Sequence, residues 1–322
     1  MAAGLGTRLR PLSYDLPKPM APVVNRPIME HILDLLPRHG FREVVANLHW
    51  FPDLIRDRFK DGSGFGMELT YSYEQELLGT AGGVRNVADF LGSDSFLVMA
   101  ADALTDIDLG GLAEAHRAND GIATLAVKRI ANVKEFGVVI ADGDRRIQGF
   151  QEKPDPAEAL SDLASCMIYA LDSAIFDYFP ARPAVDFALD VFPTLLDHDV
   201  PFYVHEIDAY WNDVGSLPEY LQGNLDALEG AVRVKLSGEL LEAAGGEEAV
   251  ERGDPGVSGR VLAAEGCEVD PRARLDGPLV IGGGCVVGAG ARVTHSVLLP
   301  GAQVAPGALV AGAVYGQRTD WE

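Results

Sequence analysis

The first twenty residues carry the clearest chemistry of this chain, with Gly-Leu-Gly-Thr-Arg-Leu-Arg-Pro at 4–11 and Pro-Lys-Pro-Met at 17–20. Glycines one residue apart let a backbone turn present its N–H groups to a phosphate, and Arg8, Arg10 and Lys18 add positive charge. The dinucleotide fingerprint G-x-G-x-x-G is excluded because Leu9 stands at the third glycine position, and no Gly-Lys-Ser/Thr completes a Walker A loop. We therefore predict a different phosphate loop, one that binds a triphosphate.

Further glycine-rich and acidic motifs follow along the chain. Leu-Gly-Thr-Ala-Gly-Gly spans 78–83, an apolar run at 95–101 ends at Asp102, Glu-Lys-Pro spans 152–154, and Asp213 lies in Trp-Asn-Asp-Val-Gly at 211–215. Taken singly, an aspartate at a strand end is as often a turn former or helix cap as a ligand, and a glycine run is usually a turn. Taken together with the loop, these motifs resemble the signature of the sugar-1-phosphate nucleotidyltransferases, which make nucleotide-sugars.

The resemblance implies a reaction in which a sugar phosphate attacks the α-phosphorus of a nucleoside triphosphate and expels pyrophosphate. No covalent intermediate is required, so positioning and charge neutralisation do most of the catalysis. The resemblance further implies Mg²⁺ held by Asp102 and Asp213, since hard cations prefer carboxylates. It places Arg8 on the β- and γ-phosphates, Lys18 near the α-phosphate and Lys153 on the sugar phosphate. These five residues are the expected catalytic set.

Two groups of binding residues are implied in the same way. The nucleotide-binding residues are expected to be Ala3, Gly4, Gly6, Thr7, Arg8, Leu78, Gly79, Thr80 and Gly82. Glycines at 78–83 allow the backbone to lie against a base, and Glu76 is a candidate acceptor for guanine donors. The sugar-phosphate residues are expected to be Gly137, Glu152, Lys153 and Ser165. Val-Asp-Phe at 185–187 also matches the family pattern. Ser-Cys-Met at 165–167 departs from the family's usual Asn-Ala-Gly, which removes a polar contact and adds bulk.

Alternating helices and strands must position these residues. Apolar spacing predicts helices at 28–36 and 51–59 and strands at 43–48, 68–73, 95–101, 122–128 and 146–150. The pattern over 1–228 predicts an α/β, Rossmann-like nucleotidyltransferase domain with a mostly parallel sheet and ligands at the carboxyl ends of the strands. Relatives place an apolar strand ahead of the loop. Met1 stands only three residues before Gly4, so we expect this first strand to be missing.

The remaining third of the chain is expected to be built differently. Residues 229–259 are rich in Gly, Glu and Ala and are predicted to be a linker. In 260–316, apolar triplets begin every sixth residue from Cys267 to Leu309, which predicts a hexapeptide-repeat domain resembling a short left-handed parallel β-helix. Cys267 and Cys285 lie 18 residues apart and should stack on successive coils, at a spacing that permits a disulfide. We expect reduced, space-filling thiols instead, as is usual for buried cysteines inside cells.

Composition narrows the classes of partner. A chain of 322 residues predicts two domains, and no apolar run reaches the roughly 18 residues of a membrane span. No leader precedes a cleavage site, so we expect a cytoplasmic protein. A net charge of −22 disfavours nucleic acid and anionic membranes, whereas the first 26 residues hold four basic side chains against one acidic one. The three cysteines and seven histidines show no metal-ligand spacing.

Within the family, the combination of motifs and the short repeat tail looks most like the mannose-1-phosphate guanylyltransferases. The expected substrates are therefore GTP and mannose 1-phosphate, and the expected product is GDP-mannose. Uridylyl-, thymidylyl- and adenylyltransferases acting on a glucose-type or heptose 1-phosphate are alternatives. A non-catalytic regulatory subunit of the same fold is another, although retention of the five catalytic residues argues against it. Hexapeptide repeats favour self-association into a homo-oligomer.

Overall fold

The computed structural model describes residues 1–241 and 255–316, which form two compact units. The first unit holds residues 1–5, 33–102 and 107–211, and the second holds 6–32, 103–106 and the residues from 212 onward. The chain therefore passes between the units inside the glycine loop, after Leu5, and again next to Asp102 and Trp211. The predicted division into 1–228, 229–259 and 260–316 stays a prediction, and residues 242–254 of the predicted linker lie outside the described part.

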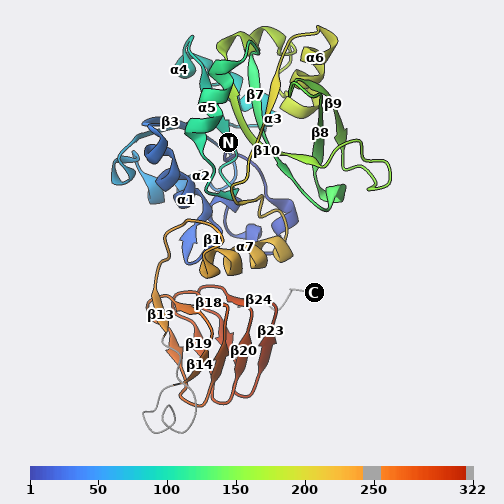
Figure 1. Ribbon diagram of the computed structural model, residues 1–322. Coiled ribbons are helices and arrows are strands. Elements are labelled where there is room, and N and C mark those ends of the chain that lie inside the picture. The colour runs from blue at the N-terminus through green and yellow to red at the C-terminus, as the bar shows by residue number, and fades with distance from the viewer. Residues whose placement is uncertain (242–254, 317–322) are drawn as a thin grey trace. The chain divides into compact units, whose positions relative to one another are not determined.

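A six-stranded sheet lies at the centre of the first unit (Figure 1). Its strand order is β11-β7-β10-β8-β9, and β5 pairs with β10 off this path. The six strands are β5 (Phe96–Met99), β7 (Ala123–Arg129), β8 (Gly137–Ala141), β9 (Ile147–Glu152), β10 (Leu163–Leu171) and β11 (Tyr203–Glu206). A separate pair joins β3 (Glu43–Leu48) and β4 (Glu68–Tyr73), whose bounds match the two strands predicted there.

The prediction of a mostly parallel sheet is wrong. Within this sheet β11 and β7 are parallel, whereas β10 runs antiparallel to β5, β7 and β8, and β8 runs antiparallel to β9. Residues 123–127 of β7 are all buried, so this strand is covered on both faces. The uninterrupted apolar runs that suggested parallel strands therefore indicate burial on both faces and not strand direction. Antiparallel strands covered on both faces carry the same signal, so an apolar run does not decide strand direction.

Helices and short turns pack around these strands. The α-helices are α2 (Pro52–Phe59), α3 (Gly79–Arg85), α4 (Ala88–Leu91), α5 (Leu109–Ala118) and α6 (Phe192–Asp197), and α1 (Ile28–Leu35) runs from the second unit into the first. The shorter turns are η4 (Leu36–His39), η5 (Ser63–Phe65), η6 (Val133–Glu135), η7 (Ser173–Tyr178) and η8 (Phe187–Val191). The core beside them is aromatic, with the rings of Phe150, Phe192 and Phe202 stacked on one another. None of the helices in the described residues is long and apolar enough to cross a bilayer.

The amino-terminal part of the second unit consists of short elements and one longer helix. These are η1 (Thr7–Leu9), η2 (Leu12–Tyr14), η3 (Lys18–Met20), β1 (Pro22–Val23), β2 (Arg26–Pro27), β6 (Leu104–Thr105) and α7 (Leu217–Glu229). Strand β12 (Trp211–Asn212) spans the boundary between the last residue of the first unit and the second unit. The sequence specifies both ends of α7. Ser216 caps its first turn by accepting the N–H of Glu219, and Gly230 follows with a φ of 86°, a left-handed conformation that glycine adopts freely.

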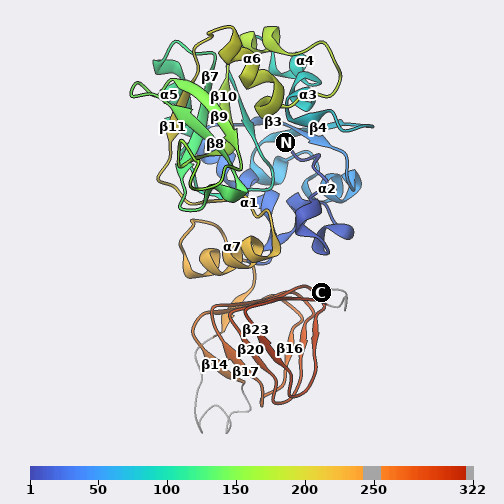
Figure 2. The same ribbon diagram turned by 90° about the vertical axis from the view of Figure 1, so that its right-hand side faces the viewer.

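Short parallel strands fill the carboxyl-terminal part of the second unit (Figure 2). They form sheets ordered β13-β15-β18-β21-β24, β14-β17-β20-β23 and β16-β19-β22. Strand β13 pairs antiparallel with β15, and the other strands pair in parallel. The strands are β13 (Glu239–Leu241), β14 (Gly256–Ser258), β15 (Val261–Ala263), β16 (Glu268–Val269), β17 (Arg274–Asp276), β18 (Leu279–Ile281), β19 (Val286–Val287), β20 (Arg292–Thr294), β21 (Val297–Leu298), β22 (Gln303–Val304), β23 (Leu309–Ala311) and β24 (Val314–Tyr315).

The sequence predicts a six-residue repeat that stays in phase through its full length. The structure differs, because the pairing offset changes within the repeat. Val261 pairs with Leu279, 18 positions on, but Val280 pairs with Val297, only 17 positions on. Because the turn at 295–296 is one residue shorter than its counterpart in the coil before, the buried residue moves from the third position of each triplet to the second. Cys267 and Cys285 are both free thiols, and Glu268 next to the first donates its N–H to the carbonyl of the second.

Candidate active site

The phosphate-loop segment of the second unit turns at Gly6. This residue has a φ of 60°, and a Cβ built on it would lie 3.0 Å from Cβ of Lys18, so a side chain at position 6 would be both strained and crowded. The turn is fixed from outside as well, because Ser13 Oγ donates to the Gly6 carbonyl at 2.7 Å. The predicted loop residues Gly6, Thr7 and Arg8 and the predicted Lys18 therefore belong to one local structure.

Asp213 is the point at which the basic residues of this segment converge. Lys18 is only 8% exposed, and its ammonium group donates to the Asp213 backbone carbonyl at 2.6 Å. Arg8, which is half exposed, places Nη2 3.4 Å from Asp213 Oδ2. The second unit thus gathers three of the five predicted catalytic residues. Burial of Lys18 also separates it from an ordinary solvated lysine.

The turn after Asp213 holds its carboxylate in place. Gly215 donates its N–H to Asp213 Oδ1 at 3.1 Å, and a Cβ at Gly215 would lie 2.6 Å from Oδ2 and 2.9 Å from Arg8 Nη1. A side chain at position 215 would therefore displace the Asp213 carboxylate or the Arg8 guanidinium, which gives the glycine of the Asp-Val-Gly motif a role in their placement. Glu219 stands nearby on α7, and its burial together with the Asp213 charge raises the pKa of its carboxyl group.

Asp102 lies three residues beyond the end of β5 in the first unit. The backbone before it is tied on both sides, because Ala100 donates its N–H to the Met167 carbonyl and Ala101 donates its own to the Met1 carbonyl at 2.8 Å. Residues 1–6 contain no strand, and Met1 and Ala2 instead bond to the ends of neighbouring strands. The first unit therefore brings the predicted Ala3 and Gly4 segment to the strand end that carries Asp102.

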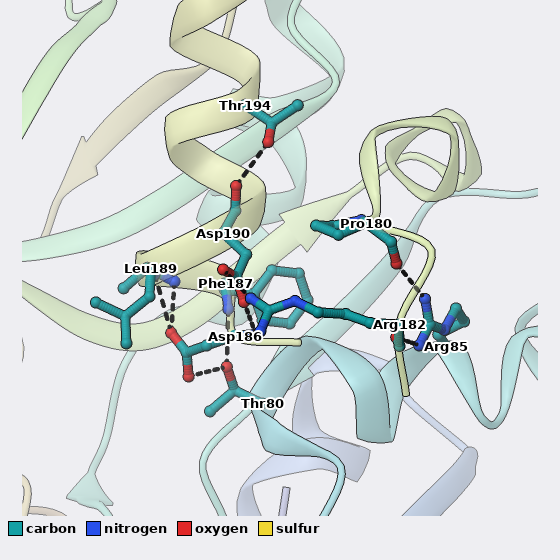
Figure 3. A network of polar contacts seen from close by, with 10 residues as sticks. Thr80, Arg85, Pro180, Arg182, Asp186, Phe187, Leu189, Asp190 and Thr194 are labelled. Atoms are coloured by element: carbon teal, nitrogen blue, oxygen red, sulfur yellow. Dashed lines mark hydrogen bonds and ion pairs between the residues drawn. The ribbon is translucent and has the colours of Figure 1, made fainter. Parts of the chain in front are cut away.

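The predicted base segment, 78–83, opens helix α3 and is clamped by residues 180–190 (Figure 3). Thr80 donates its hydroxyl to Asp186 Oδ2 at 2.7 Å and accepts the N–H of Phe187. The N–H groups of Ala81 and Gly82 both donate to the Val185 carbonyl. The Thr80 hydroxyl thus has a partner within the protein, and the Val-Asp-Phe motif is the structure that holds the base segment.

A second layer of contacts fixes the clamp itself, as the dashed lines in Figure 3 show. Arg85 at the end of α3 donates to the carbonyls of Pro180, Arg182 and Pro183. Arg182 pairs with Asp190, whose other carboxylate oxygen accepts the N–H of Asp186. Side chains of the base segment and helix α3 therefore bond to carbonyl groups and a carboxylate of residues 180–190.

Gly79 offers a direct test of this clamp. Its φ is 75°, and a Cβ there would lie 2.5 Å from the Val185 carbonyl oxygen. Gly79→Ala is expected to lower the free energy of unfolding by about 2 to 4 kcal/mol, because it adds backbone strain and forces the clamp open. Denaturant unfolding measures this. Gly64→Ala is the control, since nothing lies within 4 Å of a Cβ at that exposed turn position. Equal stabilities for the two variants would contradict the clamp.

The predicted sugar-phosphate residues lie together on neighbouring strands of the first unit. Gly137 on β8 pairs with Glu152 on β9, and Ala164, next to Ser165 on β10, pairs with Val138. Lys153 donates its N–H to the Phe136 carbonyl, and its Nζ is 3.8 Å from Glu152 Oε1. Four residues that the sequence separates by up to 28 positions therefore share one end of the sheet.

The departure from the family pattern at 165–167 coincides with an irregular stretch of β10. The pairing with β7 shifts between Ser165 and Tyr169, and Met167 has a φ of 54°, which favours glycine. The Met167 side chain is 39% exposed. Trp211 holds the irregularity by donating Nε1–H to the Cys166 carbonyl at 3.2 Å. Sequence reasoning missed this role of Trp211, because a carbonyl acceptor 45 residues away leaves no local signal.

The described residues contain no cluster of three or more His, Cys, Asp or Glu side chains able to enclose a metal. Asp102 and Asp213 are both carboxylates next to glycine-rich or strand-end backbone, and oxygen donors of this kind suit Mg²⁺. Because Mg²⁺ is typically held by one or two carboxylates together with substrate phosphates, each of these aspartates suits it without a full set of protein ligands.

The glycine turn and the carboxylates that follow strands on this α/β fold are features expected of a protein that binds nucleotides. A family model described as nucleotidyl transferase matches residues 1–230. The chain belongs to this family, and the resemblance drawn from its motifs is confirmed. More precisely, it is a sugar-1-phosphate nucleotidyltransferase, whose substrates are a nucleoside triphosphate and a sugar 1-phosphate.

The relatives differ in the activities that their names state. A UTP–glucose-1-phosphate uridylyltransferase of Synechocystis is 34% identical over 98% of this chain and 86% of its own length. A mannose-1-phosphate guanylyltransferase of Mycobacterium tuberculosis is 33% identical over 89% of this chain and 81% of its own. Among solved structures, HddC of Yersinia pseudotuberculosis has a TM-score of 0.61 at 23% identity and covers 69% of this chain and 95% of its own, a likeness of fold.

Proposed function

We propose that this protein transfers a guanylyl group from GTP to mannose 1-phosphate, forming GDP-mannose and pyrophosphate. The observation that carries the transfer itself is the convergence of Lys18 and Arg8 on Asp213, which concentrates cationic groups and a metal-binding carboxylate at one place. The choice of guanine and mannose is supported by the motif pattern and by the Mycobacterium tuberculosis relative.

In the proposed reaction an oxygen of the sugar phosphate attacks the α-phosphorus, and the bond from that phosphorus to the bridging oxygen breaks. Lys153 binds the attacking phosphate, Arg8 binds the β- and γ-phosphates, and Lys18 neutralises charge near the α-phosphorus. Mg²⁺, held by Asp102 and Asp213, would supply further charge neutralisation for the departing pyrophosphate. Ala3, Gly4, Gly6 and Thr7 contact the phosphates, residues 78–82 contact the base, and Gly137, Glu152 and Ser165 contact the sugar phosphate.

A second candidate is uridylyl transfer to glucose 1-phosphate, which the Synechocystis relative favours. A pyrophosphate-release assay with Mg²⁺ distinguishes the two candidate reactions. In this assay, five nucleoside triphosphates are each paired with mannose, glucose and heptose 1-phosphates. The highest kcat/KM with GTP and mannose 1-phosphate supports our proposal. The highest value with UTP and glucose 1-phosphate replaces it, and no turnover with any pair supports a non-catalytic subunit.

Removal of divalent cations tests whether the proposed reaction requires Mg²⁺. Excess EDTA is expected to reduce pyrophosphate release to background, because both substrates are anionic and two protein carboxylates then add uncompensated negative charge. Addition of Mg²⁺ beyond the chelator should restore the rate. An undiminished rate in excess EDTA would contradict the assignment of Asp102 and Asp213 as metal ligands.

We also propose that residues 260–316 form a left-handed parallel β-helix that mediates self-association. The parallel pairing at offsets of 18 and 17 residues supports a coil of three short strands. Sedimentation of the full chain, compared with a variant shortened after Gly230, measures the contribution of this region to the oligomeric state.

A further inference from the structure

Glu74 is a buried carboxylate that the proposed reaction does not use. It follows strand β4 directly and is only 2% exposed. Its two oxygens have separate partners, because Oε1 accepts from Asn47 Nδ2 at 2.7 Å and Oε2 accepts the N–H of Leu78 at 3.0 Å. A charged group buried in this way is costly unless it is hydrogen-bonded, and such charge-assisted bonds are short and strong. The two hydrogen bonds therefore offset the cost of burying Glu74 and fix its carboxyl group between Asn47 and Leu78.

Asn47 continues the same chain of contacts from strand β3, which pairs with β4 (Figure 2). Its side chain is nearly buried, and its Oδ1 accepts the N–H of Ala2 at 2.8 Å. Gly83 leaves room for the pair, since a Cβ there would lie 2.6 Å from both Asn47 Nδ2 and Glu74 Oε1. A glycine inside helix α3 is thus explained by the hydrogen bond packed against it.

The backbone groups at the two ends of this series of hydrogen bonds, those of Ala2 and Leu78, lie at the starts of two predicted nucleotide-binding segments. Ala2 lies two residues before Gly4 of the phosphate loop, and Leu78 directly precedes Gly79 of the base segment. Three hydrogen bonds through the side chains of Asn47 and Glu74 therefore join backbone groups that are 76 positions apart in the sequence.

We propose that Asn47 and Glu74 are positioning residues for the nucleotide: they form a buried clasp that sets the spacing between the phosphate loop and the base segment. This inference rests on the proposed function, because it assumes that the two segments bind parts of one nucleotide. With the spacing preset, base and phosphates bind without a cost of ordering one segment against the other.

Reversal of the clasp provides the test. Glu74→Gln keeps the shape but presents an NH₂ group to one of two donors, whichever way its amide turns. Asn47→Asp places two carboxylates against each other. The double variant Asn47→Asp with Glu74→Gln restores every bond, since the new carboxylate at 47 can accept from Ala2 and from the new amide at 74, whose oxygen accepts from Leu78. Total charge is unchanged.

Calorimetric titration with GTP and with UTP, without sugar phosphate, measures nucleotide affinity in all four proteins. Each single variant is expected to weaken binding about tenfold, since an unsatisfied buried group costs roughly 1 to 3 kcal/mol, and the double variant is expected to bind within about threefold of the parent. The KM for the sugar phosphate should change less than about twofold. Gln222→Glu is the control, because it sets two carboxylates side by side, next to Asp226, at an exposed position of α7.

Denaturant unfolding of the same proteins separates positioning from folding. If the single variants lose stability but bind nucleotide with parental affinity, the clasp is structural and the proposal is overturned. Failure of the double variant to recover affinity while it recovers stability also overturns it. Because affinity is measured without turnover, absence of pyrophosphate release from the parent protein would reject the proposed function alone. Absence of nucleotide binding by the parent would reject both.

Discussion

Asp213→Asn is expected to lower kcat/KM by about a thousandfold or more while the protein stays folded. The amide keeps an oxygen that can accept the Gly215 N–H, and the Lys18 ammonium bonds the backbone carbonyl at 213 rather than the side chain. What the substitution removes is the negative charge that faces Arg8 at 3.4 Å and that we propose binds Mg²⁺. A thousandfold loss corresponds to about 4 kcal/mol of transition-state stabilisation, within the range that a metal supplies.

Three measurements separate this result from general damage. The free energy of unfolding should change by less than about 1 kcal/mol, because the ion pair with Arg8 is exposed to solvent. The Mg²⁺ concentration for half-maximal activity should rise. Asp144→Asn, at an exposed loop position, serves as the matched control and should retain full activity. Activity within tenfold of the parent protein in the 213 variant would remove Asp213 from the metal site.

Local signals in the sequence were sufficient for much of this fold. The strands at 43–48 and 68–73 have the predicted bounds, and the helix predicted at 28–36 is observed at 28–35. Such elements are predictable because apolar spacing reports which face is buried. Strand direction, in contrast, could not be predicted from local sequence. Whether β10 runs parallel or antiparallel to β7 depends on how the chain returns between them, which no local window records.

In the candidate site, too, local features could be predicted from the sequence and long-range contacts could not. Gly6, Gly79 and Gly215 could be identified from motifs, and each position has a steric reason to be glycine. The contacts that hold the motifs could not be predicted, because they join residues far apart in sequence. Asn47 and Glu74 look like ordinary polar ends of two strands until their hydrogen bond is seen. The one-residue shift in the repeat escaped prediction for another reason, since the triplets keep their six-residue spacing while a single turn is shortened.

Lys18→Met is expected to reduce kcat by about a hundredfold to a thousandfold. Lysine at this position is only 8% exposed, so its ammonium group is held in one place and acts with little solvent screening. Methionine has a similar length without the charge, which leaves the packing against Gly6 largely unchanged. The expected loss appears mainly in kcat, because charge near the α-phosphorus matters most when pyrophosphate is leaving. Lys60→Met is the control, since Lys60 is exposed beyond α2.

The dependence on Mg²⁺ decides how Lys18 acts. Its ammonium donates to the Asp213 carbonyl at 2.6 Å, so the substitution could also act by releasing Asp213 from its position. In that case raised Mg²⁺ would recover most of the lost activity, because a displaced carboxylate weakens metal affinity and saturation compensates for it. If Lys18 instead neutralises phosphate charge directly, saturating Mg²⁺ leaves kcat low. We expect the second result, because the Asp213 side chain is held independently by Gly215 and Arg8.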